Sequence, residues 1–501
     1  MNVLILRRRF RWVYCQLEAL RYCLPPSVRG ILDDLPETLD ETYERILRHI
    51  NKANREHACR LLQCLTVAVR PLRVEELAEV LAVNFDAARH GGIPLSNADW
   101  RWADQHQAVL STCSSLIVVV GDGDSRVVQF SHFSVKEFLT SDRLAHSSGE
   151  VSPYHILLKP AHTILAQVCL GVLLGLDEHV TEYNAEETPL AEYAARYWVD
   201  HVQFEDVSSR IRDLMEYFFD VDKAHWAAWL RVYDIDQKSW DLFTPNPSDD
   251  YPESPHAVPL YYAALCGFFD LAEYLVFKNP EHANFRCGKM VSPLVAALRG
   301  NHFELAKLLH RHGGDLHVRG MRERIPLHAA SSSGLVDMAL WLLNHDMDVN
   351  TQDKFLWVPL HLAAYNAELQ TCRVLLEHNA VVNARDRWGE TPLHKVATST
   401  IARSDITRFW HDQPNTMRFL LGQGADVNAQ DNDGSTPLHH SSFWQKEDFA
   451  FQKGSVEGSR ILLEHGANIN AKNNEGKTPL QVALEAGHDE MAEFLSNQGA
   501  K

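Results

Sequence analysis

The sequence predicts a mainly α-helical protein whose second half is an array of similar units. The dipeptide Pro-Leu recurs in that half, and its successive prolines lie 34, 33, 33, 33, 45 and 42 residues apart. The last two intervals equal 33 plus 12 and 33 plus 9. A period near 33 indicates repeated units that bury their apolar faces only against one another. The prolines are Pro259, Pro293, Pro326, Pro359, Pro392, Pro437 and Pro479.

Each unit carries the sequence signals of two helices. A proline is tolerated in the first turn of a helix, because its missing N–H has no intrahelical acceptor there. Gly424 and Gly466 are placed to end the second helix of their units in the left-handed conformation. Apolar residues at helical spacing then form a face that only a neighbouring unit can bury. In one unit these residues are Leu360, Ala363, Ala364, Val374 and Leu375.

Four segments of the second half resemble ankyrin repeats. Residues 391–394 and 436–439 read Thr-Pro-Leu-His, the tetrapeptide of that family, and residues 375–383 and 462–470 resemble the helix end and hairpin that follow it. The resemblance covers residues 255–501. It implies seven repeats in an α-solenoid with β-hairpin fingers. The sequence departs from the tetrapeptide at Val258, Ser292, Ile325 and Val358 in place of threonine, and at Tyr261, Val295 and Gln481 in place of histidine.

The tetrapeptide histidines recur with the repeat period. They are His328, His361, His394 and His439. We therefore expect them in the same turn of successive repeats, hydrogen-bonded locally, with a structural role rather than a role as metal ligands.

The first half of the chain predicts helices followed by a β-hairpin. Thr38 and Glu41 form a capping box at the start of one helix. Two short apolar segments separated by a polar turn predict the hairpin. This order of elements is typical of a winged helix, which we place at residues 71–145. The predicted helices and strands lie at residues 39–50, 59–69, 75–81, 116–120, 126–130 and 135–139.

Several segments of this half resemble the region that follows the nucleotide-binding core of fungal NACHT-type (STAND) proteins with ankyrin repeats. The matching segments are residues 10–20, 35–43, 130–139, 161–170 and 193–198. In that family a P-loop NTPase precedes these parts, and nucleotide exchange switches the protein between closed and oligomeric states. The resemblance also makes His132 similar to a winged-helix histidine that senses a nucleotide phosphate, although we expect a structural role at the base of the hairpin here.

The resemblance and the repeats together give a predicted domain order. It consists of a remnant helix from the end of the NTPase (1–23), a helical domain (24–70), the winged helix (71–145), a helical spacer (146–244), a proline-rich acidic linker (245–254) and the ankyrin repeats (255–501).

A P-loop is the feature of the NACHT family that this sequence does not contain. Its motif, G-x-x-x-x-G-K-[ST], is absent, and so are the G-x-S-x-G and H-E-x-x-H motifs of hydrolases. We therefore expect no enzymatic activity and no cofactor. Two readings remain open: a non-enzymatic interaction scaffold or sensor module, or a fragment of a signalling NTPase whose ATP-binding core lies upstream. The coding sequence before Met1 separates them.

The missing P-loop gives a direct prediction. ATP should leave the melting temperature of the purified protein unchanged, because no backbone cradle for its phosphates is present. Differential scanning fluorimetry with and without micromolar ATP measures this. A reproducible rise of a few degrees would show that the chain binds the nucleotide.

Composition restricts the class of partner. The net charge is −18, from 48 basic and 66 acidic side chains, which disfavours nucleic acid because its affinity rests on clustered positive charge. No apolar segment approaches the length that spans a bilayer. The nine cysteines contain no C-x-x-C pair. We expect reduced thiols and a cytoplasmic protein that binds neither membrane nor nucleic acid.

The predicted partner-binding residues lie on the fingers before the third, fourth and fifth tetrapeptides. Exposed tryptophan and arginine on adjacent rigid fingers have the composition of an interface hot spot. They favour an acidic or aromatic-bearing segment of a partner protein. The alternative is that the aromatic side chains fold back onto neighbouring hairpins. The nine residues are Arg319, Arg322, Arg324, Lys354, Phe355, Trp357, Arg385, Arg387 and Trp388.

Two further features of the repeats are expected to matter. The later fingers are acidic, with Asp431, Asp433 and Glu475, and suit a different part of the partner. The extra 12 and 9 residues are predicted to lie between the two helices of repeats five and six.

Overall fold

The computed structural model describes residues 38–85, 94–102, 104–121, 126–147, 149–176, 188–220, 225–238, 258–288, 291–398, 406–442, 445–447, 450–452 and 456–501. It divides into two compact units, one ending at Ile235 and one beginning at Asp236. The predicted remnant helix at residues 1–23 and the predicted linker at residues 245–254 lie outside the described residues. Within the described residues, no helix combines the length and the apolar composition needed to cross a membrane.

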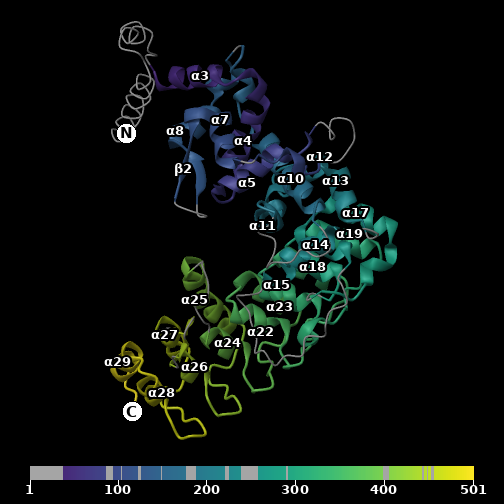
Figure 1. The fold of residues 1–501 in the computed structure, drawn as a ribbon. Helices are drawn as coiled ribbons and strands as arrows, with labels where there is room; N and C mark the ends of the chain where they lie inside the picture. Colours follow the sequence, from purple (N-terminus) through teal and green to yellow (C-terminus); the bar gives the residue numbers. More distant parts are fainter. Residues whose placement is uncertain are drawn as a thin grey trace. The chain divides into compact units, whose positions relative to one another are not determined.

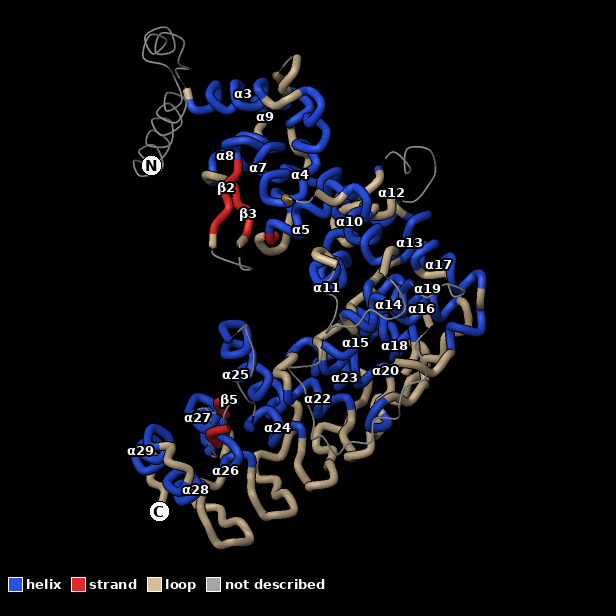
Figure 2. The backbone as a smooth tube through the Cα atoms, viewed as in Figure 1, coloured by secondary structure: helices blue, strands red, loops and turns tan. Residues whose placement is uncertain are grey.

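The first unit begins with a small α/β arrangement that contains the predicted hairpin. Strand β3 is the centre of an antiparallel sheet of order β1-β3-β2, in which Val128 lies opposite both Leu72 and Val119 (Figure 2). Helix α5 packs against α7, and α4 packs against α7 and β3. The elements are α3 (Leu39–His49), α4 (Arg55–Val67), β1 (Leu72–Arg73), α5 (Val74–Glu79), α7 (Gln105–Cys113), β2 (Ile117–Val120), β3 (Val127–Phe130) and α8 (Phe133–Leu139).

Local sequence signals explain how these elements begin and pack. The capping box predicted at the start of α3 is present, with the Glu41 N–H donating to Thr38 Oγ1 and the Thr38 N–H donating to Glu41. Tyr43 is buried between α3 and α8, where its hydroxyl lies 2.8 Å from Ser134 Oγ. His132 caps α8, because its Nδ1 accepts the Ser134 N–H at 3.2 Å.

Two buried carboxylates of α5 are neutralised by arginines. Glu76 pairs with Arg70 at 2.7 Å and Arg73 at 3.1 Å, and Glu79 pairs with Arg101 at 2.8 Å. Burial would raise the pKa of Glu76, but the hydrogen bond from Arg70 and the Arg73 N–H hold it below the usual value. A buried carboxylate needs such partners, so these pairs fix α5 against its surroundings.

The rest of the first unit is helical in its described residues, and α10 to α15 lie within the predicted spacer at residues 146–244. Helix α10 packs against α4 and α11. Aromatic rings fill the core between α11, α13 and α14. The centre of the Trp198 ring lies 5.2 Å from that of Trp229 and 5.7 Å from that of Phe218, and both pairs meet edge to face. The helices are α9 (Asp142–Ala145), α10 (Leu158–Leu174), α11 (Ala191–Val202), α12 (Val207–Arg210), α13 (Arg212–Phe218), α14 (His225–Val232) and α15 (Ile235–Lys238), the last of which crosses the boundary between the units.

The second unit consists of seven helix pairs with long loops along one side (Figure 1). The first helix of each pair packs against the first helix of the next. The second helices also pack against one another, and α19 and α21 meet through the rings of Phe303 and Trp341. We number the repeats one to seven by these pairs, and the loop before each first helix is its finger. The pairs are α16 (Pro259–Cys266) with α17 (Phe269–Lys278), α18 (Pro293–Arg299) with α19 (Phe303–Arg311), α20 (Pro326–Ser332) with α21 (Val336–Leu343), α22 (Pro359–Tyr365) with α23 (Leu369–Glu377), α24 (Pro392–Thr398) with α25 (Ile406–Gly422), α26 (Pro437–Ser442) with α27 (Val456–Glu464), and α28 (Pro479–Glu485) with α29 (Asp489–Asn497).

The helix termini confirm the signals read from the sequence. Every repeat proline is the first residue of its helix. Gly424 and Gly466, which end the second helices of repeats five and six, both have φ near 87°, a left-handed conformation that glycine adopts without steric cost.

In several repeats, an asparagine that follows the second helix binds backbone groups that follow the second helix of the next repeat. Asn383 accepts the Asp426 N–H at 2.9 Å and donates to the Gly424 carbonyl at 3.1 Å. Asn350 makes the corresponding pair of bonds with residues 379 and 381, and Asn428 with residues 466 and 468. Repeats three to six are therefore held to one another by side chains as well as by apolar packing.

The two longer repeats differ in how the extra residues are used. In repeat five the second helix, α25, is 17 residues long, against 9 for α23 in repeat four. In repeat six a short antiparallel hairpin of β4 (Gln445–Glu447) and β5 (Ala450–Gln452) lies between α26 and α27. The extra residues of repeat six therefore lie between its two helices as predicted, whereas in repeat five part of the insertion lengthens α25 itself.

Candidate partner-binding site

Fingers four to seven are each held in shape by one side chain at the base of the finger. In finger five the Asp386 carboxylate accepts the backbone N–H groups of Trp388 and Glu390, both at 2.9 Å. A finger closed in this way presents the side chains between its base and its helix in a fixed direction. The residues that accept the corresponding two bonds in fingers four, six and seven are Asp353, Asp431 and Asn473.

Neighbouring fingers are also hydrogen-bonded through their backbones. The Arg387 N–H donates to the Phe355 carbonyl at 3.0 Å, and the Asn432 N–H donates to the Trp388 carbonyl at 2.8 Å. The other two bonds run from Lys354 to Arg322 and from Asn474 to Asp433, both at 2.8 Å. The fingers of repeats three to seven therefore form a continuous edge rather than separate loops.

The tetrapeptide histidines link each repeat to the next finger. His361 Nδ1 accepts the Val358 N–H at 3.1 Å, so its other nitrogen carries the proton and donates to the Glu390 carbonyl at 3.2 Å. The same two bonds are made by His328, His394 and His439. This confirms the predicted structural role, and it adds a bond between repeats that the sequence alone did not reveal.

Burial keeps these histidines neutral. It lowers the pKa of His328, His361 and His394 to about 4, and it lowers the pKa of His439 in the same direction. In repeat seven an amide takes over the capping role, because Gln481 Oε1 accepts the Thr478 N–H at 2.9 Å.

The nine predicted partner-binding residues, here called the finger patch, divide into two groups. Phe355 and Trp388 stack across fingers four and five, with ring centres 5.7 Å apart and planes inclined by 24°. The Arg387 guanidinium lies 5.8 Å from the Phe355 ring and 5.5 Å from the Trp388 ring. Arg322 and Lys354 lie 5.4 Å and 5.3 Å from the Phe355 ring. The structure therefore brings five of the nine residues into one cluster.

The other four residues of the finger patch bind the array itself. Arg324 Nε donates to the buried carboxylate of Asp353 at 3.0 Å. Arg319 and Arg385 are exposed but donate to backbone carbonyls of the next finger, those of Gln352 at 3.4 Å and Gln430 at 2.7 Å. Trp357 is half-buried. The alternative, in which the aromatic side chains fold back onto neighbouring hairpins, stays open, because Phe355 and Trp388 also contact each other across two fingers.

Lys395 is a site residue that the sequence reasoning missed. It is only 6% exposed, and its ammonium pairs with Asp386 at 2.7 Å and with Glu390. The same ammonium lies 4.4 Å from the Trp357 ring and 5.3 Å from the Trp388 ring. Burial lowers the pKa of Lys395, and the hydrogen bond from its ammonium to Asp386 opposes that shift.

A signal for Lys395 does exist in the sequence. It follows the tetrapeptide histidine directly, a position filled by alanine, leucine, histidine or valine in repeats three, four, six and seven. A lysine at a position that the period places beside the helix core requires buried acidic partners.

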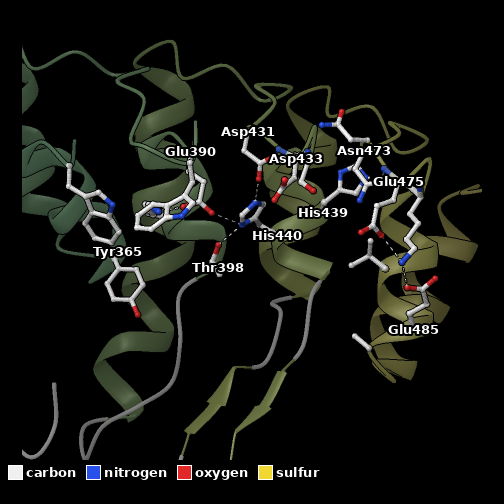
Figure 3. A pocket seen from close by; sticks show the side chains of 18 residues that line it. Tyr365, Glu390, Thr398, Asp431, Asp433, His439, His440, Asn473, Glu475 and Glu485 are labelled. Carbon is white, nitrogen blue, oxygen red and sulfur yellow. Dashed lines mark hydrogen bonds and ion pairs between the residues drawn. The ribbon is translucent and has the colours of Figure 1, made fainter. Parts of the chain in front are cut away.

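A groove of about 950 Å³ runs along the fingers and first helices of repeats four to seven (Figure 3). His440 lies at its centre, with Nε2 2.7 Å from Asp431 and Nδ1 2.9 Å from the Thr398 hydroxyl. Burial would raise the pKa of Asp431, but the hydrogen bond from His440 holds it below the usual value. The lining residues are Trp357, Tyr365, Trp388, Glu390, Lys395, Thr398, Asp431, Asp433, Ser435, His439, His440, Asn473, Asn474, Glu475, Lys477, Val482, Glu485 and Ala486.

Three side chains beside this groove have the spacing of a metal site. The candidate ligand atoms of His394, Asp431 and His440 lie within 4.8 Å of one another. His394 has no free lone pair, however, because Nδ1 accepts the Thr391 N–H and the protonated Nε2 donates to the Ser435 carbonyl. We interpret the three residues as part of the hydrogen-bond network of the groove.

Comparison with known proteins agrees with the two architectures. Models of ankyrin repeats match residues 260–353, 342–396 and 408–501, and the model of the GPI inositol-deacylase winged helix domain matches residues 43–149. The latter match spans the predicted winged helix at residues 71–145 and also α4, in the predicted helical domain at residues 24–70.

One protein to which this chain is similar is the azaphilone pigments biosynthesis cluster protein L of Monascus ruber. The two are 31% identical over 301 residues, which cover 57% of this chain and 61% of the relative. The alignment thus covers less than two thirds of that relative. The resemblance to NACHT-type proteins stays a prediction. The chain carries ankyrin repeats and, ahead of them in the sequence, a winged-helix domain of the GPI inositol-deacylase type.

Proposed function

We propose that this protein is a non-enzymatic interaction module that binds a partner protein on the fingers of its ankyrin repeats. Ankyrin repeats are protein-interaction modules, which supports the class of function. The observation that carries the proposal is the stack of Phe355 and Trp388 with three cationic side chains around it. Aromatic and arginine side chains dominate the binding energy of protein interfaces.

The chemistry of this cluster favours an acidic partner segment that carries an aromatic side chain. Arg387 and Lys354 are exposed, so a carboxylate can reach them from solvent. Trp388 is 46% exposed and offers an apolar surface beside them. The backbone hydrogen bonds between fingers already order this surface, which reduces the conformational entropy lost on binding.

Removing the two exposed cations should weaken the complex without affecting the fold. We expect Lys354→Gln with Arg387→Gln to bind a labelled synthetic peptide of glutamate and tryptophan about tenfold more weakly than the unmodified chain. Fluorescence anisotropy with the full chain measures the affinity, and circular dichroism checks the fold.

A matched control separates the finger patch from the overall charge. Arg418→Gln with Arg460→Gln removes the same charge from exposed positions on α25 and α27. This control should bind the peptide as the unmodified chain does. An equal loss in both double variants would mean that the peptide responds to net charge alone, and the finger patch would not be the site.

A second candidate function is that of the C-terminal part of a signalling NTPase. The winged-helix match at residues 43–149 favours it, because the NACHT-type proteins that the chain resembles place such a domain between the NTPase and the repeats. In that case the repeats would still bind a partner, and binding would control an ATP-dependent switch located elsewhere.

A further inference from the structure

The groove of repeats four to seven differs in charge from the finger patch. Its lining includes five carboxylates and two lysines, a surplus of three negative charges when the histidines are counted as neutral. Both lysines are already paired: Lys395 with Asp386 and Glu390, and Lys477 with Glu475 at 2.7 Å and Glu485 at 2.6 Å. The groove therefore presents a negative surface beside the cationic fingers.

Several of these carboxylates are accessible from solvent. The side chains of Glu475 and Glu485 are 68% and 58% exposed, and Asp433 is exposed at the tip of finger six. Figure 3 shows Glu475 and Glu485 converging at one end of the groove, with Glu390 and Tyr365 toward the other. Acidic groups thus extend along the groove rather than forming a single pair.

The other end of the groove is aromatic. Trp357 lies 5.9 Å from Tyr365, and Trp388 adds its exposed ring. This wall already holds one cation, because the Lys395 ammonium lies against both tryptophans and two carboxylates. A cation of the partner would make the same kinds of contact as Lys395, with an aromatic ring and a carboxylate.

We propose that this groove binds an arginine-containing basic segment of the partner protein. The inference rests on the proposed function and specifies the second half of the partner's binding segment. Arginine fits better than lysine, since its planar guanidinium pairs with a carboxylate through two hydrogen bonds and stacks on an aromatic ring. Nucleic acid does not fit, because the groove carries the same sign of charge as a phosphate backbone.

The two surfaces give the bound segment a direction. Trp388 contributes to both of them, since its ring stacks on Phe355 in the finger patch and lines the groove. A segment that runs along the finger patch and then the groove would place its acidic and aromatic end over repeats three to five. Its arginines would then lie in the groove, between the tryptophans of fingers four and five and the carboxylates of repeats six and seven.

Peptide binding to the full chain tests this arrangement. The probe is a labelled synthetic peptide in which arginines alternate with glycine and serine, measured by anisotropy at low and at physiological ionic strength. We expect Glu475→Gln with Glu485→Gln to weaken its binding about tenfold. The same variant should bind the glutamate and tryptophan peptide normally. Trp388→Ala should weaken both peptides.

The control variant is Glu464→Gln with Glu493→Gln, which removes two exposed carboxylates from α27 and α29 outside the groove. It should bind the arginine peptide as the unmodified chain does. An equal loss in the control, or an arginine peptide that does not bind at all, would overturn the groove proposal. Failure of the finger patch itself would appear separately, as loss of specific binding by the acidic peptide.

Discussion

Replacing Lys395 by methionine is expected to destabilise the ankyrin repeats by about 3–5 kcal/mol, the usual cost of removing one partner from a buried ion pair. The substitution keeps the length of the side chain but leaves Asp386, whose side chain is fully buried, without its counter-charge. Asp386 cannot leave its place, because its other oxygen closes finger five through the N–H groups of Trp388 and Glu390. Urea unfolding followed by circular dichroism measures the loss.

Repeat seven indicates a second substitution that should restore the stability lost in Lys395→Met. There, Asn473 closes the finger in place of an aspartate, and Val482 occupies the position of the lysine. The double variant Lys395→Met with Asp386→Asn copies that neutral arrangement. It should recover most of the stability, because the amide oxygen still accepts the finger N–H groups and no charge is left buried.

The half-buried Lys477 of the groove, whose partners are exposed, provides the matched control. Lys477→Met removes the same type of side chain from two carboxylates that remain in contact with water, and surface ion pairs contribute little to stability. The unfolding midpoint should therefore scarcely change. If Lys395→Met were as mild as Lys477→Met, the ion pair of repeat five would not be part of the folding core.

The repeat period predicted a large part of this architecture because it acts on local structure. The prolines begin helices, the glycines end them, and the insertion of repeat six lies between helices, all of which depend on residues close in the chain. The period also contained a contact that the sequence reasoning did not use. Arg322, Phe355 and Trp388 occupy the same position in fingers three, four and five, 33 residues apart. Equivalent positions in stacked repeats are neighbours, so their stacking follows from the spacing.

The environment of Lys395 could not be predicted in the same way. Its partners are Asp386 at the base of finger five, Glu390 at the end of that finger, and two tryptophans on adjacent repeats. Whether Trp357 faces solvent or a neighbour depends on which side chain fills the space beneath it. The side chain that packs against Trp357 is determined by contacts between repeats, which cannot be predicted from the neighbouring residues in the sequence. For this reason the nine residues of the finger patch divided into a surface cluster and a structural group.

Acidification should unfold the ankyrin repeats in a pH range set by their buried histidines. His328, His361 and His394 have a pKa of about 4 when folded, against 6.5 for a free histidine. The folded chain thus binds fewer protons than the unfolded chain between these values. Stability is therefore complete above pH 6.5 and falls as the pH drops toward 4. At pH 5 the loss is about 2 kcal/mol for each histidine.

Gln481 of repeat seven indicates the variant that tests whether the buried histidines cause this loss of stability. Gln481 accepts the Thr478 N–H without a titratable group, so His328→Gln, His361→Gln and His394→Gln together should retain the cap and flatten the loss between pH 6.5 and 5. Urea midpoints measured across that range give the slope. The control His312→Gln, His317→Gln and His465→Gln changes three exposed histidines of the same unit and should keep the slope of the unmodified chain. A slope that survives the first triple variant would assign acid sensitivity to other groups. A slope that disappears would assign the acid sensitivity to these three histidines, whose protonation removes the Nδ1 acceptor of each cap.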